Sequence, residues 1–292
     1  MNFIIFFLIL ILSFFTTYSD ELVIESESRW ELFLKNFYSK PDYVKNQTLL
    51  SAFYGRSFTD INQKNITNFS DIHNLDFYYG FIRVNEKIKY KDNFQHQGEY
   101  VFLGNTSTNF KTFQFDVKGI VTDSWRFGFG LNDGYGVYFL GNKLFLNHST
   151  AFTWIRIDVD YFSGDSLDIN FIKRFDERFK FGSLYSAGIT YQLYDFINLD
   201  FNYEHSYYFP NYEFLPWFGS WIFDNILQRG PELFQREIEA ELDDYYPYFK
   251  LIYKNLISLI TTELRRQNGY FPFSSESTLN YDTFKIGIVL II

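Results

Sequence analysis

Apolar and polar side chains alternate along most of the chain, so that residues of one kind recur at every second position. In 113–117, for example, Phe113, Phe115 and Val117 are separated by Gln114 and Asp116. Successive residues of a β-strand point to opposite sides, and the alternation therefore predicts strands with one apolar and one polar face. The same pattern predicts further strands at 75–81, 125–131, 155–161, 167–171, 185–193 and 199–203.

Turn-forming sequences separate several of these segments. They are Asn132-Asp133-Gly134, Gly141-Asn142 and Ser163-Gly164-Asp165. Asn, Asp and Gly adopt the backbone conformations that tight hairpin turns require. The order of strand, turn and strand predicts an antiparallel meander.

A soluble β-sandwich also alternates, but three features favour a transmembrane β-barrel. Several predicted strands reach about 9 to 11 residues, the length a tilted strand needs to cross the hydrocarbon layer. Aromatic residues make up 23% of the chain and concentrate at the apolar positions. The polar face carries charges, which a water-filled lumen tolerates and a packed core does not. The residues that we expect to line the lumen are Asp116, Lys118, Arg126, Arg156, Asp158, Asp160, Asp200 and Glu204.

The C-terminal segment 280–292 alternates back from the chain end, with Phe284, Ile286, Ile288, Leu290 and Ile292 on one face. This pattern resembles the closing strand of bacterial outer-membrane β-barrel proteins. The resemblance implies a location in the bacterial outer membrane, contact with its lipid, and insertion by the barrel-assembly machinery, which reads the last strand. That strand usually ends in Phe or Trp, so the terminal Ile is a departure that concerns recognition by the machinery and not the fold.

The opposite face of this last segment begins polar and ends apolar. Lys285 and Gly287 face the lumen if Ile286 and Ile288 face lipid, and Val289 then faces inward as well. Apolar residues that point into a lumen are best explained by packing. We therefore expect the barrel to be filled at the end where the chain terminates.

A segment of different character, 209–279, separates the last two predicted strands. Residues 214–229 are aromatic and compatible with a helix, 232–244 form an amphipathic helix after Pro231, and 248–266 carry apolar residues at helical spacing. An insertion of about 70 residues is far longer than a hairpin loop.

The termini of bacterial barrels face the periplasm, which places this insertion on the extracellular side. It could enter the lumen as a plug, cover the mouth as a self-packed cap, or lie on the membrane; the cap is the simplest interpretation. The residues expected to contact the membrane or the cap are Trp217, Phe218, Trp221 and Phe223.

The N-terminal region is set apart from the barrel. Residues 3–15 form a nearly unbroken apolar run that is short for a membrane span and is followed by small polar residues. We interpret 1–19 as a secretory signal peptide, with a retained anchor as the alternative. Residues 20–70 then form a lead-in with a possible first strand, and 71–292 form the barrel.

Composition narrows the class of protein further. The chain has 35 acidic and 26 basic residues and a net charge of -9, so it lacks the basic surface that binding to nucleic acid requires. After the predicted signal peptide there is no apolar run long enough for a membrane-spanning helix. The chain has no cysteine, and the absence of disulfides favours a bacterial envelope protein over a secreted eukaryotic domain.

The sequence contains little that indicates catalysis. Outer-membrane phospholipases resemble this class in fold and carry a His and a Ser two residues apart on one strand face. Here the residue two positions after His148 is Thr150, and Ser149 points to the other face. No catalytic residue is assigned, and the protein is more readily interpreted as a non-enzyme.

A metal site is not expected either. Asp158, Asp160, Asp165 and Asp168 could approach a cation such as calcium. Cross-strand pairing with neighbouring cations such as Arg156 explains the same pattern without an ion. We therefore predict no metal and no cofactor.

Together these patterns predict an all-β protein, an antiparallel transmembrane barrel of about ten strands, within a range of eight to twelve, with a helical insertion before the last strand. The function that we expect is narrow transport or binding of a small solute or lipid. Two alternatives are a lipid-modifying enzyme of the outer membrane and a structural or adhesive surface protein.

Overall fold

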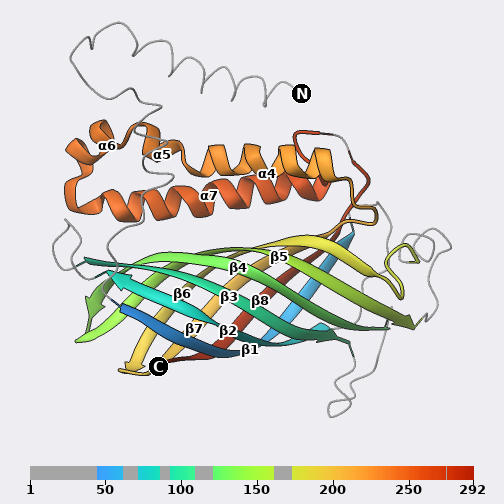
Figure 1. Ribbon diagram of the computed structural model, residues 1–292, viewed down its shortest axis with the longest axis horizontal. Coiled ribbons are helices and arrows are strands. Elements are labelled where there is room, and N and C mark those ends of the chain that lie inside the picture. Colours follow the sequence, from blue (N-terminus) through green and yellow to red (C-terminus); the bar gives the residue numbers. More distant parts are fainter. Residues whose placement is uncertain (1–44, 62–71, 86–92, 109–120, 161–172, 274) are drawn as a thin grey trace, which may run out of the picture. The chain divides into compact units, whose positions relative to one another are not determined.

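The computed structural model describes residues 45–61, 72–85, 93–108, 121–160, 173–273 and 275–292 (Figure 1). The predicted signal peptide and the predicted strands at 113–117 and 167–171 lie outside these ranges. Asp116 and Lys118 lie outside them as well.

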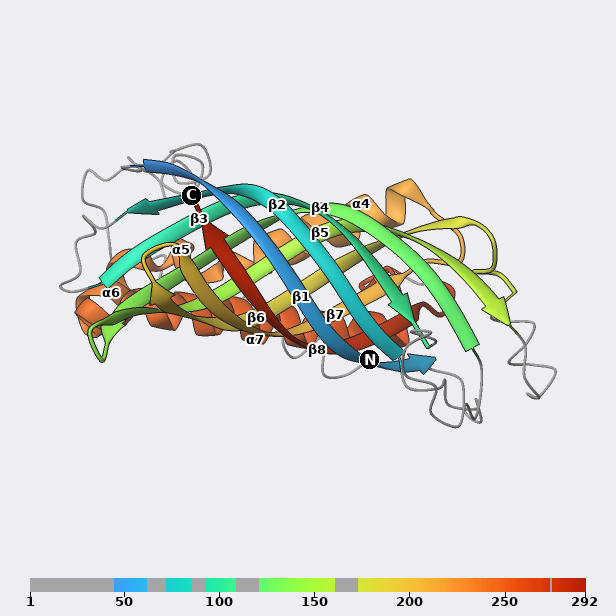
Figure 2. The same ribbon diagram turned by 90° about the horizontal axis from the view of Figure 1, so that it is seen from below.

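Eight antiparallel strands form a closed barrel in which each strand pairs with its neighbour in the chain and the first pairs with the last (Figures 1 and 2). The closed antiparallel barrel and the helical insertion before its last strand are confirmed. The strands are β1 Lys45–Ile61, β2 Ile72–Asn85, β3 Asn93–Ser107, β4 Val121–Phe139, β5 Asn142–Asp160, β6 Phe179–Tyr194, β7 Ile197–Tyr208 and β8 Leu279–Ile291.

The strand number is at the lower end of the expected range because the strands are long. They run from 12 residues in β7 to 19 residues in β4 and β5, beyond what crossing the hydrocarbon requires. Asn132-Asp133-Gly134, predicted as a turn, lies inside β4 and is paired with β5. The turn predicted at Gly141 does connect β4 to β5, with positive φ angles of 53° at Leu140 and 83° at Gly141. The first strand, β1, lies within 20–70, for which the sequence predicted a lead-in with a possible first strand.

Aromatic side chains fill the lumen beside inward-facing glycines of β4. A Cβ atom on Gly128 would lie 2.6 Å from the Phe102 ring, and one on Gly130 would lie 2.6 Å from the Tyr100 ring. A glycine in a strand often marks such a close approach. The alternation of glycine with apolar residues in β4 thus leaves space inside and an apolar face outside.

One end of the lumen is closed by a packed apolar layer, at the end where β7 finishes and β8 begins. This end layer consists of Ile72, Ile155, Ile157, Val159, Phe175, Tyr208, Leu279 and Tyr281. The sequence predicted packing at the opposite end, next to the C-terminus. There Val289 is buried as expected, but it lines a cavity, and the packed layer lies at the other end.

The insertion contains α4 Phe214–Gln228, α5 Gly230–Leu233, α6 Gln235–Leu242, the short 3-10 helix η1 Asp243–Tyr245, and α7 Tyr246–Gln267. We call 214–267 the hairpin. Helices α4 and α7 pack against each other, and α7 also contacts β4, β5 and β6 (Figure 1). In the view from below, β1, β2 and β8 lie in front and the helices lie behind the barrel (Figure 2).

The hairpin therefore lies along the outside of the barrel wall. The sequence placed it in the lumen, over the mouth or on the membrane, and favoured a cap. None of the helices in the described ranges has both the length and the apolarity that define a membrane-spanning helix.

Candidate functional site

Four charged side chains from four different strands meet in the middle of the lumen. Arg126 donates to Asp76 through Nε at 3.0 Å and through Nη2 at 2.5 Å, and to Glu204 through Nη1 at 2.6 Å. Lys285 Nζ lies 2.7 Å from Asp76 Oδ2 and also donates to Glu204. All four side chains are at most 2% exposed. We call this set the charge network.

The charge network is electrically balanced and closed in by aromatic rings. Two cations face two carboxylates, and the bidentate contact between Arg126 and Asp76 is of the strongest kind. The guanidinium also lies 5.6 Å from the centre of the Phe102 ring, and Lys285 Nζ lies 5.8 Å from that of Tyr78. The charge network and these rings fill the lumen at mid-height.

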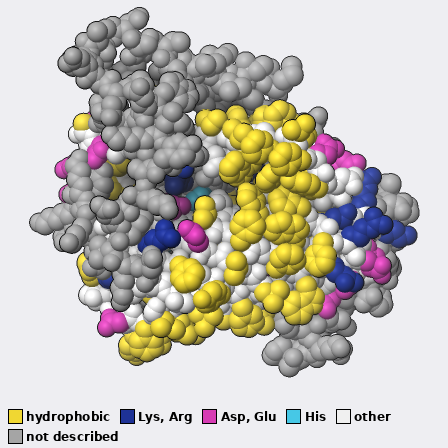
Figure 3. All heavy atoms as spheres, viewed as in Figure 1, with side chains coloured by type: hydrophobic (Ala, Val, Ile, Leu, Met, Phe, Trp, Pro, Cys, Tyr) yellow, Lys and Arg dark blue, Asp and Glu magenta, His cyan; other side chains and the backbone are white. Residues whose placement is uncertain are grey.

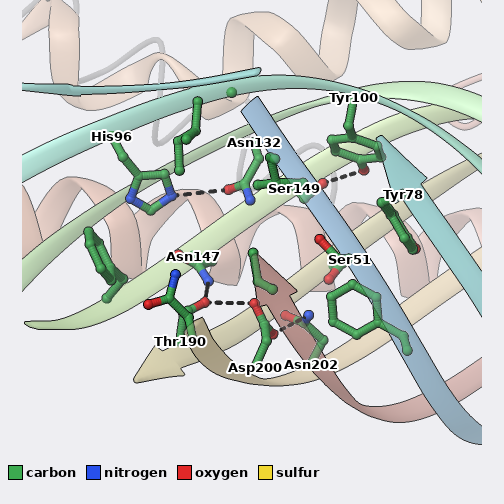
Figure 4. A pocket seen from close by; sticks show the side chains of 18 of the residues that line it. Ser51, Tyr78, His96, Tyr100, Asn132, Asn147, Ser149, Thr190, Asp200 and Asn202 are labelled. Carbon is green, nitrogen blue, oxygen red and sulfur yellow. Dashed lines mark hydrogen bonds between the residues drawn. The ribbon is translucent and has the colours of Figure 1, made fainter. Parts of the chain in front are cut away.

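A small polar cavity lies on the C-terminal side of the charge network. Figure 4 shows side chains that line it. Its volume is about 80 Å³. Asn147 donates to Thr190, which donates to Asp200, and Asn202 donates to the same carboxylate. A polar cavity of this size holds a few water molecules, and it is small for an organic solute.

Further hydrogen-bonded pairs connect the strands that form the cavity wall. Tyr100 and Ser149 share a hydrogen bond of 2.5 Å, and His96 Nε2 lies 3.4 Å from Asn132 Oδ1 (Figure 4). These side chains come from three adjacent strands, β3, β4 and β5. The cavity is therefore held by a hydrogen-bonded frame and not by apolar packing alone.

A second polar region lies on the outside of the wall, beneath α7. Lys254 Nζ contacts Asp133 Oδ2 at 2.8 Å, and Asn255 Oδ1 lies 3.0 Å from His148 Nδ1. Tyr185 donates to the backbone carbonyl of Asn255 at 3.2 Å. Polar groups on the outer face of a membrane barrel are costly when they face hydrocarbon. The hairpin covers them.

At the other end of α7 a buried arginine joins the two helices. Arg265 donates to Asp224 of α4 at 3.1 Å and to both the hydroxyl and the carbonyl of Ser220 at 3.0 Å. Its guanidinium lies 5.6 Å from the centre of the Tyr207 ring on β7. The following residue, Arg266, contacts Asp282 of β8 at 2.9 Å. These contacts hold both helices to the wall.

The loops that enter and leave the hairpin are joined by Tyr270. Its ring stacks on Phe209 with centroids 4.3 Å apart, and its hydroxyl donates to the Asn211 carbonyl at 2.9 Å and accepts from the Glu213 amide at 2.8 Å. Burial raises the pKa of Tyr270 to about 12. The hydroxyl thus stays protonated and able to donate at all physiological pH values.

A cavity of about 260 Å³ lies between the hairpin and the wall, and we call it the lateral cavity. Its polar lining includes Ser258, Thr262, Arg265 and Asp224. Its apolar lining includes residues that are exposed on the outer surface of the protein, namely Phe129, Leu131 and Trp221. The lateral cavity is therefore polar inside and apolar where it meets the surface.

The exposed surface carries a broad apolar band that continues from the barrel onto the helices, with charged side chains on both sides of it (Figure 3). On β4 the large exposed residues are Trp125, Phe127, Phe129 and Leu131. A closed antiparallel barrel with charges inside and such a band outside is built for a bilayer. The chain has the fold of a bacterial outer-membrane β-barrel protein.

Solved structures of outer-membrane barrels are similar to this chain in fold. Neisserial surface protein A is 7% identical, with 85% of this chain and 99% of that chain covered and a TM-score of 0.39. Ail, the attachment invasion locus protein of Yersinia pestis, is 10% identical over 85% of this chain and 100% of that chain, with a TM-score of 0.34. OprG from Pseudomonas aeruginosa is 8% identical over 86% of this chain and 97% of that chain, with a TM-score of 0.27. No family model and no curated protein sequence matches the chain.

Three of the residues predicted to line the lumen of this outer-membrane barrel do lie there. Arg126 and Glu204 belong to the charge network, and Asp200 lines the small cavity. Asp76 was not among the predicted residues, although it lies on the polar face of a predicted strand, between Leu75 and Phe77.

Arg156 and Asp158 differ from the prediction, because their side chains are 49% and 57% exposed and lie 3.6 Å apart on the outer face of β5. Their neighbours Ile155 and Ile157 point inward, into the end layer. At this end of β5 the predicted pattern is reversed, because the apolar side chains belong to the packed end layer and the charged side chains point outward. The side chain of Asp160 lies outside the described residues.

The four aromatic residues predicted at the membrane or cap take separate places. The Trp217 ring centroid lies 5.4 Å from that of Phe152 on β5, so this residue packs on the wall. Phe218 stacks on Trp221 at 5.9 Å, and both are exposed. Phe223 packs against Phe271 at 5.8 Å.

His148 and Ser149 point to opposite faces of β5, as the sequence predicted. Ser149 bonds Tyr100 inside the barrel, and His148 faces Asn255 outside it. The described residues contain no group of three or more His, Cys, Asp or Glu side chains placed to hold a metal ion.

Proposed function

We propose that this protein is a non-conducting outer-membrane barrel that binds a small lipid or solute at its lipid-facing side, where the hairpin packs on the wall. The observation that carries the proposal is the orientation of the hairpin, which turns its apolar face outward and its polar face toward the barrel. Lipid is the surrounding medium in which that orientation is stable.

Helix α7 exposes large apolar side chains and buries polar ones, although Leu251 and Ile257 are buried as well. Ile252, Leu256 and Leu259 are 61%, 51% and 48% exposed, whereas Ser258 and Thr262 are buried. A helix on a protein in water turns its apolar side to the core. In hydrocarbon the exposed apolar side is favourable, and the inward polar side is satisfied by the barrel wall.

Length and position also suit the hydrocarbon layer. The 22 residues of α7 correspond to a helix about 33 Å long, close to the hydrocarbon thickness of about 30 Å. Lys254 contacts Asp133 in the second half of β4, and Arg266 contacts Asp282 in the first half of β8. These contacts align α7 with the length of the strands. Helix α4 has one charged residue, Asp224, which is paired with Arg265.

The filled lumen favours binding over transport. The charge network occupies the middle of the barrel, and the end layer closes the end where β7 finishes. An ion would have to separate buried charge pairs to pass, which is costly in a low-dielectric interior. The lateral cavity, by contrast, opens at the surface.

We expect single-cysteine labelling to show the hairpin in lipid. The chain has no cysteine, so Ile252→Cys and Leu259→Cys can be labelled without a background. In proteoliposomes both are expected to resist a membrane-impermeant maleimide, and after unfolding in SDS both are expected to react. The control is Leu140→Cys, in the β4–β5 turn and 82% exposed, which is expected to react in both states. Equal labelling at all three positions would place the hairpin in water and refute the proposal.

The same preparation is expected to show no channel activity. Planar bilayers that contain the folded protein are expected to keep the conductance of protein-free bilayers, because the charge network and the end layer leave no continuous path. The variant Arg156→Met, with its exposed side chain, serves as a control for effects of charge outside the lumen. Steady unitary conductance in the wild-type protein would contradict the non-conducting assignment and favour transport.

A further inference from the structure

We infer that the lateral cavity is a binding site for a neutral amphiphile whose head group donates a hydrogen bond, such as a long-chain alcohol. The inference rests on the proposed function, because it requires lipid at the mouth of the cavity. It adds the place of the site and the chemistry of its ligand.

The mouth of the lateral cavity suits entry from the bilayer. Phe129 and Leu131 on β4 are 49% and 61% exposed, and Trp221 on α4 is 38% exposed. All three line the cavity and belong to the apolar surface of the protein. An amphiphile dissolved in the membrane reaches this mouth by lateral diffusion and keeps its tail in hydrocarbon while its head enters.

Asp224, which lines the lateral cavity, carries one unused acceptor. Asp224 Oδ2 is bonded to Arg265, but Asp224 Oδ1 is buried and has no hydrogen-bond partner among the described residues. A buried carboxylate oxygen without a partner is unfavourable, and a donor that reaches it gains the full benefit of the bond. A hydroxyl head group provides such a donor.

The charges around the lateral cavity favour a neutral head group. Arg265 and Asp224 are the charged residues that line it, and they neutralise each other at 3.1 Å. The Arg265 donors are already used by Asp224 and Ser220. An anionic head group would meet the Asp224 carboxylate with no free cation to compensate for it.

The volume of the lateral cavity limits how much of the ligand can enter it. About 260 Å³ is slightly below the range of about 300 to 1,000 Å³ typical of small-molecule pockets. A head group and the first carbons of a chain fit, and the remaining tail lies over Phe129 and Leu131 on the outer surface. Chain length is therefore expected to affect affinity less than the head group does.

Tryptophan fluorescence of the full protein in proteoliposomes tests this inference, since Trp217 and Trp221 line the lateral cavity. The probes are dodecanol brominated next to its head group and the methyl ether of the same compound, which cannot donate. We expect saturable quenching by the alcohol and binding of the ether that is weaker by about fivefold or more. Trp125 is exposed on the outer face of the barrel. Its quenching is expected to rise linearly with probe concentration and not to saturate. Equal curves for the two probes would overturn the inference.

Two variants separate the cavity from the surrounding lipid. Thr262→Phe fills the buried interior and is expected to remove the saturable quenching by the alcohol, whereas Leu259→Phe adds a ring to the outward face of α7 and is expected to retain it. Saturable quenching that survives Thr262→Phe would place the ligand elsewhere. A hairpin that is protected from maleimide but shows no saturable alcohol binding would refute this inference alone, and a labelled hairpin would refute the proposed function.

Discussion

Replacing Arg126 by methionine is expected to lower the free energy of unfolding by about 3 to 5 kcal/mol, because removing one partner of a buried ion pair leaves uncompensated charge. In this variant Asp76 and Glu204 would remain buried with Lys285 as their one cation. The loss is measured by urea unfolding of the detergent-folded protein, followed by heat-modifiable migration on gels. Among the residues of the lumen, this is the largest effect that we expect from a single replacement.

The double variant Arg126→Met, Asp76→Asn shows whether charge balance is the cause. It leaves Lys285 paired with Glu204, so we expect it to recover at least half of the lost stability. The matched control is Arg156→Met, an arginine whose side chain is 49% exposed and whose replacement is expected to change stability by about 0.5 kcal/mol or less. If the single and double variants lose equal stability, the packing of the arginine and not its charge is what matters.

Replacing Arg265 by methionine is expected to detach the hairpin from the wall while the barrel stays folded. Asp224 would lose its cation, and Ser220 would lose three hydrogen bonds at 3.0 to 3.2 Å. Breaking a buried pair in this way costs about 3 to 5 kcal/mol, which is enough to undock a segment held by few contacts. Limited proteolysis is expected to cut 214–267 in the variant and to leave the wild-type hairpin intact.

Two further variants test whether the lost ion pair is the cause of the detachment. Arg265→Met with Asp224→Asn removes both charges and is expected to restore part of the protease resistance. Glu263→Gln, on the same helix but 59% exposed at its side chain, is expected to behave as wild type. Heat-modifiable migration must persist in every variant if the hairpin is a separate layer, and its loss in Arg265→Met would show instead that the hairpin is required for the barrel.

The faces of the strands could be read from the sequence because the rule behind them is local. In β8 the exposed residues Phe284, Ile286 and Ile288 alternate with the buried Lys285, as the pattern predicted. Which side chains share a face of a strand follows from the two-residue period alone. The same local rule was wrong at Arg156 because it carries no information about depth in the membrane.

The partners inside the lumen could not be predicted in this way. Arg126 lies 50 residues from Asp76 and 78 residues from Glu204 along the chain. They meet only because the barrel closes with eight strands at one register. A barrel of ten strands would have a wider lumen, and these side chains would not reach one another.

The hairpin shows the same division between local and tertiary information. The helices themselves were predictable from apolar spacing and from Pro231, but their place on the wall was not. Asp133, His148 and Tyr185 carry polar groups on the outer face of the barrel, and they contact Lys254 and Asn255 of α7. An unusual polar residue on a lipid-facing strand could have indicated that something covers it.

By itself, then, the sequence determined that this protein forms amphipathic antiparallel strands with a helical insertion and an apolar exterior, because those properties depend on neighbouring residues. Only the tertiary structure decided that the lumen is closed by balanced charges and that the insertion lies against the outer wall with its apolar face outward. Both depend on which distant side chains meet when the barrel closes, and burying each polar group against a partner is what selects that arrangement.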